Sequence, residues 1–355
     1  MFLNSELFSH FRGSSNIGYL KVKKNDLILS AQNLHLGNCN VNLRFEHGII
    51  SPAYKVYELI DSDPLFIQAW VKQDSTKDFF LKASTEGASV CRKNIVWEEL
   101  YKQTLPIPKL EEQTKIGEYF SNLDNLITLH QRKCDETKKL KKFMLQKMFP
   151  KKDEKKPEIR FAGFTDDWEQ RKLGDIFEQT SNLVNPKVDD IELWSLTVED
   201  GLIKKSDRYN REFLVKKDDN FKEVRPGDIV YNPMNMTLGA VGYNGMEKSV
   251  AVSGYYTTMV TKDNYDSYYI NTWLKSPQAI LLYRTYATGS LIEKQRVQFP
   301  TLSIIPVAFP KYEEQVKIGN CFKSIDHLIT LHQRKCDELK EFKKYMLQNM
   351  FPQKG

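Results

Sequence analysis

The sequence predicts an α+β fold in which two α/β domains are separated by a pair of long antiparallel helices that form a coiled coil. Two observations lead to this prediction. A 43-residue segment occurs twice, at residues 108–150 and 310–352, and its apolar residues recur at spacings of three and four. The regions ahead of each segment instead alternate short β-like runs with turn residues, as in DIVYN and YYTTMV. Each helix is therefore expected to follow an α/β domain of its own.

The duplication is the strongest feature of the sequence. The two segments are offset by 202 residues and are identical at 30 of 43 positions, which chance does not produce. Weaker similarity at the same offset continues upstream, where Asp26 aligns with Asp228 and Gly37 aligns with Gly239. The helical parts are thus nearly identical, whereas the globular parts have diverged. We expect the globular parts to recognise different things from the same platform.

Each repeated segment is predicted to form one helix of about 35–40 residues, roughly 50–60 Å long. Pro108 and Pro310 stand just before it, and two glutamates follow each proline in the first turn, where carboxylates suit the helix dipole. Neither helix is apolar enough to be buried all round. We therefore expect the two to pack together antiparallel, with two independent surface helices as the alternative. The predicted seam consists of Ile116, Phe120, Leu123, Ile127, Ile318, Phe322, Ile325 and Ile329.

The repeat also predicts where the domains begin and end. The expected parts are a first α/β domain (1–107), a first helix (108–150), a charged linker (151–157), a second α/β domain (158–309) and a second helix (310–352). The second copy opens near Pro157, and about 45 residues of that opening have no counterpart in the first copy. The first domain is therefore expected to be incomplete at its N-terminus, with an open sheet edge.

Composition and charge restrict the kind of protein. The net charge of +6 is modest, so a partner must be inferred from where the charges lie. The five cysteines form no CxxC pair, which favours a reducing, cytoplasmic compartment. No apolar run approaches the roughly 20 residues that span a bilayer, and the first residues do not have the pattern of a signal peptide. No membrane partner is expected.

The sequence holds no recognisable catalytic, cofactor or metal site. There is no GxxxxGK[ST] loop for ATP and no GxGxxG loop for a dinucleotide. NPMN at residues 232–235 is interpreted as a turn after a strand. His130 and His332 occupy equivalent helix positions and have no ligand partner at a suitable spacing. We expect no catalysis, no cofactor and no metal.

Basic and amide side chains gather at two places in the second domain. Lys and Arg suit phosphate contacts, whereas Arg, Asn and Gln can also read base edges in the major groove. Any one of them could be an ordinary solvated residue, but the set predicts binding of double-stranded DNA. The DNA-binding candidates are Lys204, Lys205, Arg208, Arg211, Asn235, Thr237, Lys294, Gln295 and Arg296, with Arg92 and Lys93 in the first domain.

These motifs together resemble the specificity (S) subunit of type I restriction-modification systems. The repeated Pro-x-x-Glu-Glu-Gln-x-x-Ile-Gly motif and its LITLHQRKCDE continuation carry most of the resemblance. RFAGFTDDWEQRKLGDIF, from Arg160, resembles the opening of the family's module. ATGS and KQRV, on either side of residues 291–293, resemble the end of a target-recognition domain. The resemblance spans essentially the whole chain.

The resemblance implies a non-catalytic subunit in which each of two target-recognition domains reads half of a split DNA sequence. The helices would space the two domains over about one and a half turns of B-DNA. They would also dock two methylation (M) subunits, which carry S-adenosylmethionine and methylate adenine. Restriction (R) subunits, which cleave DNA using ATP, would join the assembled complex.

The incomplete first domain departs from the family pattern and leaves alternatives open. The chain could be a truncated, impaired or decoy S subunit that binds M subunits without productive targeting. A solitary methyltransferase would be expected to bind S-adenosylmethionine by itself. A purely structural coiled-coil protein would show no salt-dependent affinity for DNA.

Overall fold

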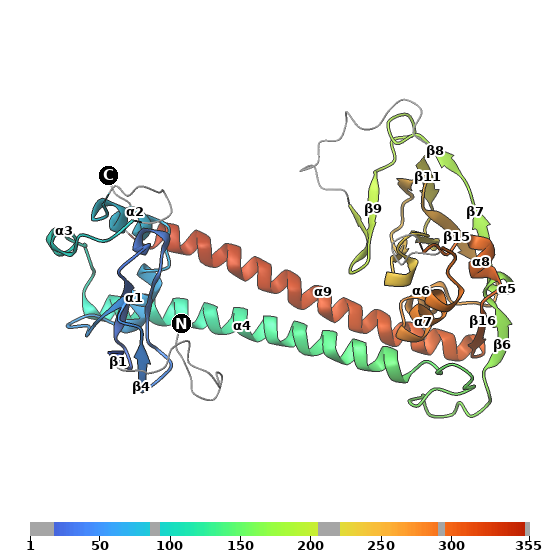
Figure 1. Ribbon diagram of the computed structural model, residues 1–355, viewed down its shortest axis with the longest axis horizontal. Coiled ribbons are helices and arrows are strands. Elements are labelled where there is room, and N and C mark those ends of the chain that lie inside the picture. Colours follow the sequence, from blue (N-terminus) through green and yellow to red (C-terminus); the bar gives the residue numbers. More distant parts are fainter. Residues whose placement is uncertain (1–17, 86–92, 205–220, 290–294, 352–355) are drawn as a thin grey trace. The chain divides into compact units, whose positions relative to one another are not determined.

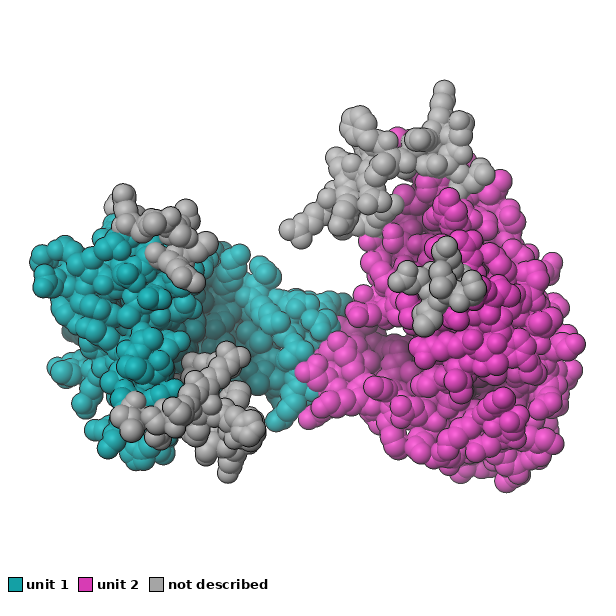
Figure 2. All heavy atoms as spheres, in the orientation of Figure 1, with its two compact units in different colours: residues 1–133, 331–355 teal, residues 134–330 magenta. Residues whose placement is uncertain are grey.

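The computed structural model describes residues 18–85, 93–204, 221–289 and 295–351. Its contacts divide the chain into two compact units (Figure 2): unit 1 holds residues 1–133 and 331–355, and unit 2 holds residues 134–330. The division passes through both long helices. Each unit therefore combines one globular part with a portion of each helix.

The two long helices occupy the repeated segments, as predicted (Figure 1). α4 spans Leu110–Lys147 and α9 spans Tyr312–Asn349, and each has 38 residues. Both have two glutamates in the first turn, where the unpaired amides of the helix end favour negative charge. Within the described residues, no helix is both long and apolar enough to cross a bilayer.

Within unit 1, the portions of α4 and α9 run in opposite directions. Lys343 Nζ lies 2.5 Å from Asp124 Oδ1. Eight residues further along the chain, just after α9, the ring of Phe351 stacks on Phe120, with 6.0 Å between the ring centroids. Residue numbers thus fall along α4 as they rise along α9, which is an antiparallel pairing.

Unit 2 repeats the same two contacts at the offset of 202 residues. Lys141 Nζ lies 2.5 Å from Asp326 Oδ1, and the ring of Phe149 stacks on Phe322 with 5.9 Å between centroids. Equal sequences therefore form equal contacts in both units, and the predicted α+β fold with antiparallel long helices is confirmed.

The apolar residues predicted for the helix seam also belong to the cores of the globular parts. In each unit they pack with the phenylalanine that follows the other long helix, Phe351 in unit 1 and Phe149 in unit 2. The helix seam and the globular core are thus continuous inside each unit. The buried residues are Ile116, Phe120 and Leu123 in unit 1 and Ile318, Phe322 and Ile325 in unit 2, whereas Ile127 and Ile329 are half-buried.

The globular part of unit 1 has a three-stranded antiparallel sheet in the order β3-β2-β5 and a two-stranded sheet of β1 and β4. Its elements are β1 (Leu20–Lys23), β2 (Leu27–Ser30), η1 (Leu34–Leu36), β3 (Cys39–Val41), β4 (His47–Ile50), β5 (Tyr54–Tyr57), α1 (Pro64–Trp70), α2 (Ser75–Lys82) and α3 (Trp97–Lys102).

The globular part of unit 2 has a four-stranded antiparallel sheet in the order β13-β12-β15-β7 and three smaller sheets, β14-β11-β8, β10-β9 and β16-β6. The helices α6 and α7 follow the last strand, in chain order, of the four-stranded sheet. The elements are β6 (Glu169–Lys172), α5 (Leu173–Ile176), β7 (Phe177–Thr180), β8 (Leu183–Val184), β9 (Trp194–Thr197), β10 (Gly201–Lys204), β11 (Phe221–Val224), β12 (Ile229–Tyr231), η3 (Met236–Leu238), β13 (Val241–Tyr243), β14 (Val250–Ser253), β15 (Thr257–Thr261), α6 (Ser267–Leu274), α7 (Pro277–Tyr286), α8 (Phe299–Ser303) and β16 (Pro306–Phe309).

The two globular parts share one frame, although their sequences have diverged. The buried Asp26 accepts a hydrogen bond of 2.7 Å from the Lys23 amide, and the buried Asp228 accepts one of 2.9 Å from the Arg225 amide. The sheet β3-β2-β5 corresponds to β13-β12-β15. The fourth strand, β7, has no counterpart among the described residues of unit 1.

The imidazoles of His130 and His332 meet in unit 1, where α4 and α9 pass each other, with 3.2 Å between their Nδ1 atoms. Since one of these nitrogens must accept, at least one ring is unprotonated there. Burial lowers the pKa of His130 below 6.5. The positive charges of His332, Lys133 and Lys335 act in the same direction. Protonation of His130 is thus harder in the folded protein than in the unfolded chain.

This pKa shift predicts that stability falls as the pH is lowered through about 6.5. In that range the unfolded chain binds more protons than the folded protein, so acid favours unfolding. His130→Asn is expected to flatten the dependence of unfolding free energy on pH between 5 and 7. Urea denaturation at several pH values measures it, with the exposed His47→Asn as the control. An unchanged slope in the His130 variant would contradict the assignment.

Candidate nucleic-acid interface

Five of the predicted DNA contacts lie outside the described residues. They are Arg92, Lys205, Arg208, Arg211 and Lys294. The other six can be placed, and they fall on turns and strand ends of the two globular parts.

Lys204 ends strand β10 and is exposed. Its Nζ lies 3.1 Å from Glu192 Oε1, and Lys248 Nζ lies 3.0 Å from the same oxygen. Hydrogen bonds from Lys248, Trp194 and Lys204 lower the pKa of Glu192 to about 2. The carboxylate is therefore ionised at neutral pH and holds two lysines together. The sequence analysis missed Lys248, because it lies 44 residues away from Lys204 along the chain.

Asn235 lies in the turn that follows β12, as the interpretation of NPMN predicted, and Thr237 lies in η3 directly after it. The Asn232 side chain accepts a hydrogen bond from the Met234 amide, and the Asn235 amide donates to the Asn232 carbonyl, 3.0 Å in both cases. Asn235 is exposed, so its amide group can reach a ligand. Thr237 is only 9% exposed, so little of its side chain is available to a ligand.

The turn after β12 is tied to the segment that holds Gln295 and Arg296. Arg296 exchanges two backbone hydrogen bonds with Thr288, of 3.0 and 2.9 Å, and the Val297 amide donates to the Pro233 carbonyl at 3.0 Å. The side chain of Arg296 is exposed and that of Gln295 is half-buried. The structure thus brings together two candidate groups that are 60 residues apart in sequence.

Unit 1 contains the same arrangement, in which the Ile95 amide donates to the Ala31 carbonyl at 3.3 Å and the Asn33 amide donates to the Lys93 carbonyl at 3.1 Å. We call these segments the paired turns: residues 30–37 with 93–95 in unit 1, and residues 232–239 with 295–297 in unit 2. Lys93 is half-buried. The side chains differ between the two pairs, while the backbone bond that joins them is kept.

Arg296→Ala is expected to weaken binding of target DNA more than binding of unrelated DNA. A two-pronged arginine contact to guanine contributes about 1–3 kcal/mol of discrimination, which is roughly five- to 150-fold. Arg284→Ala removes an exposed arginine of α7 and serves as the charge-matched control. Fluorescence anisotropy with target and scrambled duplexes measures both. An equal loss of affinity for the two duplexes would indicate that Arg296 contacts phosphate and not a base.

A repeated clasp holds each globular part on its long helix, through the Pro-x-x-Glu-Glu-Gln motif. In unit 2, the buried Gln315 donates to the Pro310 carbonyl at 2.9 Å and accepts from the Asp266 amide at 3.1 Å. In unit 1, Gln113 donates to Pro108 at 2.9 Å and accepts from the Asp63 amide at 3.0 Å. Both of these glutamines thus satisfy backbone groups at the junction of helix and globular part.

The glycine of the motif lets the long helix lie close to the first turn of α1 in unit 1 and of α6 in unit 2. A Cβ on Gly117 would lie 2.6 Å from the Phe66 nitrogen and 2.7 Å from Asp63 Oδ1. A Cβ on Gly319 would lie 2.6 Å from Asp266 Oδ1. Asp63 and Asp266 cap α1 and α6, so the cap and the long helix touch at these glycines. We call the motif glutamine and glycine, with the aspartate they contact, the helix clasp.

Unit 2 has a further tie between its globular part and α9. Arg160 donates to both oxygens of the Glu314 carboxylate, at 2.7 and 2.8 Å, and to the Asp166 carbonyl at 2.6 Å. Glu314 is 1% exposed. The carboxylate raises the pKa of Arg160 above its ordinary value through the hydrogen bond. The module opening is therefore fixed to the first turn of α9 by a buried charged pair.

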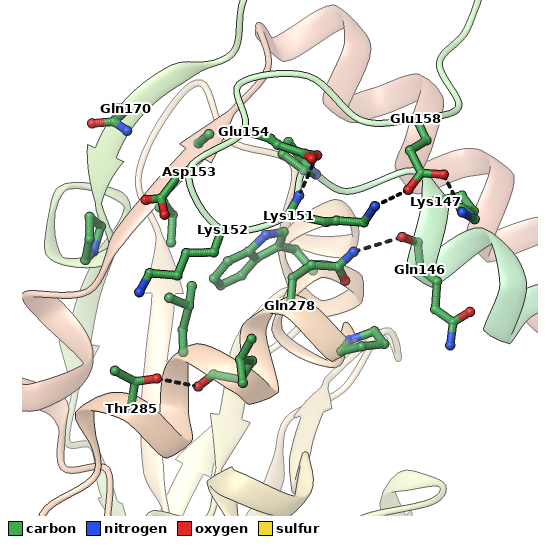
Figure 3. A pocket seen from close by; sticks show the side chains of 18 of the residues that line it. Gln146, Lys147, Lys151, Lys152, Asp153, Glu154, Glu158, Gln170, Gln278 and Thr285 are labelled. Atoms are coloured by element: carbon green, nitrogen blue, oxygen red, sulfur yellow. Dashed lines mark hydrogen bonds and ion pairs between the residues drawn. The ribbon is translucent and has the colours of Figure 1, made fainter.

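Figure 3 shows a cavity of about 630 Å³ in unit 2, between the linker after α4 and helix α7. Trp273 forms part of its apolar lining. At its rim, hydrogen bonds from Lys147 and Lys151 lower the pKa of Glu158 to about 2. Gln278 donates to the Gln146 carbonyl at 2.9 Å. These contacts hold the linker and α7 against the end of α4. No group of three metal-ligating side chains occurs in the described part of the chain.

Comparison with known proteins identifies the family. The family model described as type I restriction modification DNA specificity domain matches residues 14–139 and 165–341. The "Putative type I restriction enzyme MjaX specificity subunit" of Methanocaldococcus jannaschii is 26% identical, over 96% of this chain and 76% of its own length. The type I restriction enzyme MjaVIII specificity subunit of that organism is also 26% identical, over 76% of this chain and 66% of its own length.

The fold is also that of a solved structure. The S subunit of the type I restriction-modification system from M. genitalium superposes with a TM-score of 0.62 at 14% identity, covering 97% of this chain and 88% of that one. At this identity the likeness concerns the fold alone.

Proposed function

The chain belongs to the family of type I restriction modification DNA specificity domains, and from this premise we propose that it reads a DNA target in two halves and directs methyltransferase subunits to it. Each globular part would read one half through its paired turns. The observation that carries the proposal is that both units have the same paired turns and the same helix clasp. The side chains of the paired turns differ between the two units. A common frame with altered side chains suits two readers of different base sequences.

The partners of this function are double-stranded DNA, two methyltransferase (M) subunits and, through the assembled complex, restriction (R) subunits. Two M subunits are proposed because the paired helices have the same structure in both units, as the equivalent ion pairs Lys141–Asp326 and Lys343–Asp124 illustrate. A surface that occurs twice can bind two copies of one partner in the same way. The chain itself would be non-catalytic, so the chemistry of adenine methylation and of ATP-dependent cleavage would belong to the partners.

Co-expression with an M subunit tests this proposal. The purified complex is expected to methylate adenines at a sequence with two specified halves and an unspecified spacer. The chain alone is expected to bind DNA with an affinity that falls steeply as salt rises, because phosphate contacts release counterions. It is not expected to bind S-adenosylmethionine. Methylation by the chain alone, or no DNA affinity at low salt, would exclude the proposed function.

A decoy that binds M subunits without productive targeting is the second candidate. It is favoured by one observation: the described residues of unit 1 contain no counterparts of β6 to β10. The same co-expression separates the two candidates. Both predict a stable complex with the M subunit, whereas only the specificity subunit predicts site-specific methylation.

A further inference from the structure

We propose that unit 1 carries an acceptor surface for a polypeptide segment with the chemistry of residues 158–180, supplied by a second chain. The internal repeat provides the argument, because unit 2 shows what covers the matching surface there. The inference concerns how a reader is completed, and it holds for a productive specificity subunit and for a decoy alike.

In unit 2, the covering segment adds a strand and a tryptophan to the reader. β6 pairs antiparallel with β16 along its whole length, from Glu169 opposite Phe309 to Lys172 opposite Pro306. Trp168, just before β6, is 2% exposed and packs edge-on against Tyr269 with 6.3 Å between ring centroids. Phe309 itself is 2% exposed, and its ring packs against Tyr269 and Trp273.

The same segment forms ion pairs with charged residues at the start of α9. Arg160 donates two hydrogen bonds to the Glu314 carboxylate, and Lys311 Nζ, just before the helix, lies 2.9 Å from Asp166 Oδ2. The contact therefore combines backbone pairing with opposite charges on both sides. Such a combination specifies register as well as affinity.

Unit 1 presents the matching residues without the cover. Residues 104–107 correspond to β16 and pair with no strand of the described chain. Ile107 is 43% exposed, where Phe309 is 2% exposed. Glu112, which corresponds to Glu314, is exposed and has no charged partner among the described residues. The carboxylate that is buried against Arg160 in unit 2 is therefore exposed to solvent in unit 1.

The open surface continues as a hollow and a free sheet edge. A cavity of about 660 Å³ in unit 1 is lined by Trp70, Phe79, Leu105, Pro106 and Phe351. Trp70 corresponds to Trp273, which lines the cavity that unit 2 keeps although its covering segment is in place. Among the described residues, β5 pairs with β2 alone, whereas β15 pairs with both β12 and β7. An exposed strand edge is suited to receiving an added strand.

These features define the occupant by its chemistry. It must supply an arginine for Glu112 and two short strands, one for residues 104–107 and one for β5. Arg160, β6 and β7 are this set in unit 2. A second chain that carries a copy of the module opening would provide it.

A peptide with the sequence of residues 157–182, labelled with a fluorophore, tests the proposal against the full chain. It is expected to bind in a 1:1 ratio, as measured by fluorescence anisotropy. Arg160→Ala in the peptide, or Glu112→Gln in the chain, is expected to weaken binding about tenfold or more. Glu111→Gln, one residue away and exposed, is expected to leave binding unchanged.

Hydrogen exchange locates the bound peptide. Protection is expected at residues 104–107 and along β5. Failure of the peptide to bind, equal binding by the Glu112 and Glu111 variants, or protection confined to unit 2 would each overturn the proposal. A chain that already covers this surface with its own residues gives the first of these results.

Discussion

Arg160→Ala is expected to lower the free energy of unfolding of unit 2 by about 3 kcal/mol, because it leaves the Glu314 carboxylate buried without its partner. Glu314 is 1% exposed and receives both of its charged hydrogen bonds from Arg160. Removal of one member of such a pair costs more than the pair contributes, since the remaining charge must still be desolvated. Chemical denaturation followed by tryptophan fluorescence measures the loss.

The repeat provides a matched control for this variant. Glu112→Ala removes the corresponding carboxylate of unit 1, which is exposed, and is expected to change stability by about 0.5 kcal/mol or less. A loss below about 1 kcal/mol for Arg160→Ala would show that Glu314 can find water or another partner. The burial argument would then be wrong.

Gly117→Ala is expected to destabilise unit 1 by about 2 kcal/mol, although alanine is the better helix former. The added Cβ would lie 2.6 Å from a backbone nitrogen of α1 and 2.7 Å from both Asp63 Oδ1 and Leu65 Cβ. Overpacking against backbone costs about 1–3 kcal/mol or more, and the gain in helix propensity returns about 1 kcal/mol. The steric cost is expected to win, since Phe66 and its neighbours are fixed by the cap of α1.

Glu118→Ala, at the next and exposed position of α4, is the control for Gly117→Ala. It is expected to leave stability within about 0.5 kcal/mol of the parent chain. Denaturant midpoints for the two variants give the comparison. An increase in stability for Gly117→Ala would mean that α4 does not approach α1 closely, and the helix clasp would lose its basis.

The long helices and their pairing could be predicted because their signals are local and repeated. The apolar spacing from Ile116 to Ile127 fixes the helix, and the second copy from Ile318 to Ile329 shows that one surface must be satisfied twice. The motif that contains Gln315 and its glycine is recognisable in the sequence as a repeated pattern. Its role in joining the long helix to the globular part could not be predicted, because the groups it contacts belong to another part of the chain.

The contacts of the candidate site were harder to predict because they join distant residues. Arg160 and Glu314 are 154 positions apart, and the arginine has no repeat counterpart that would have drawn attention to it. Thr237 had the residue type of a base contact, but the turn buries it. A pattern of residue types gives composition, whereas exposure depends on which strands and turns pack above each side chain.

Exchange of one reader tests the central claim most directly. Residues 158–309 would be replaced by the matching domain of another specificity subunit, and the chain co-expressed with its M subunit. Sequencing that detects methylated adenine then maps the modified sites. The account predicts that one half of the target changes, while the other half and the length of the spacer stay the same. An unchanged methylation pattern, with the complex still assembled, would contradict it.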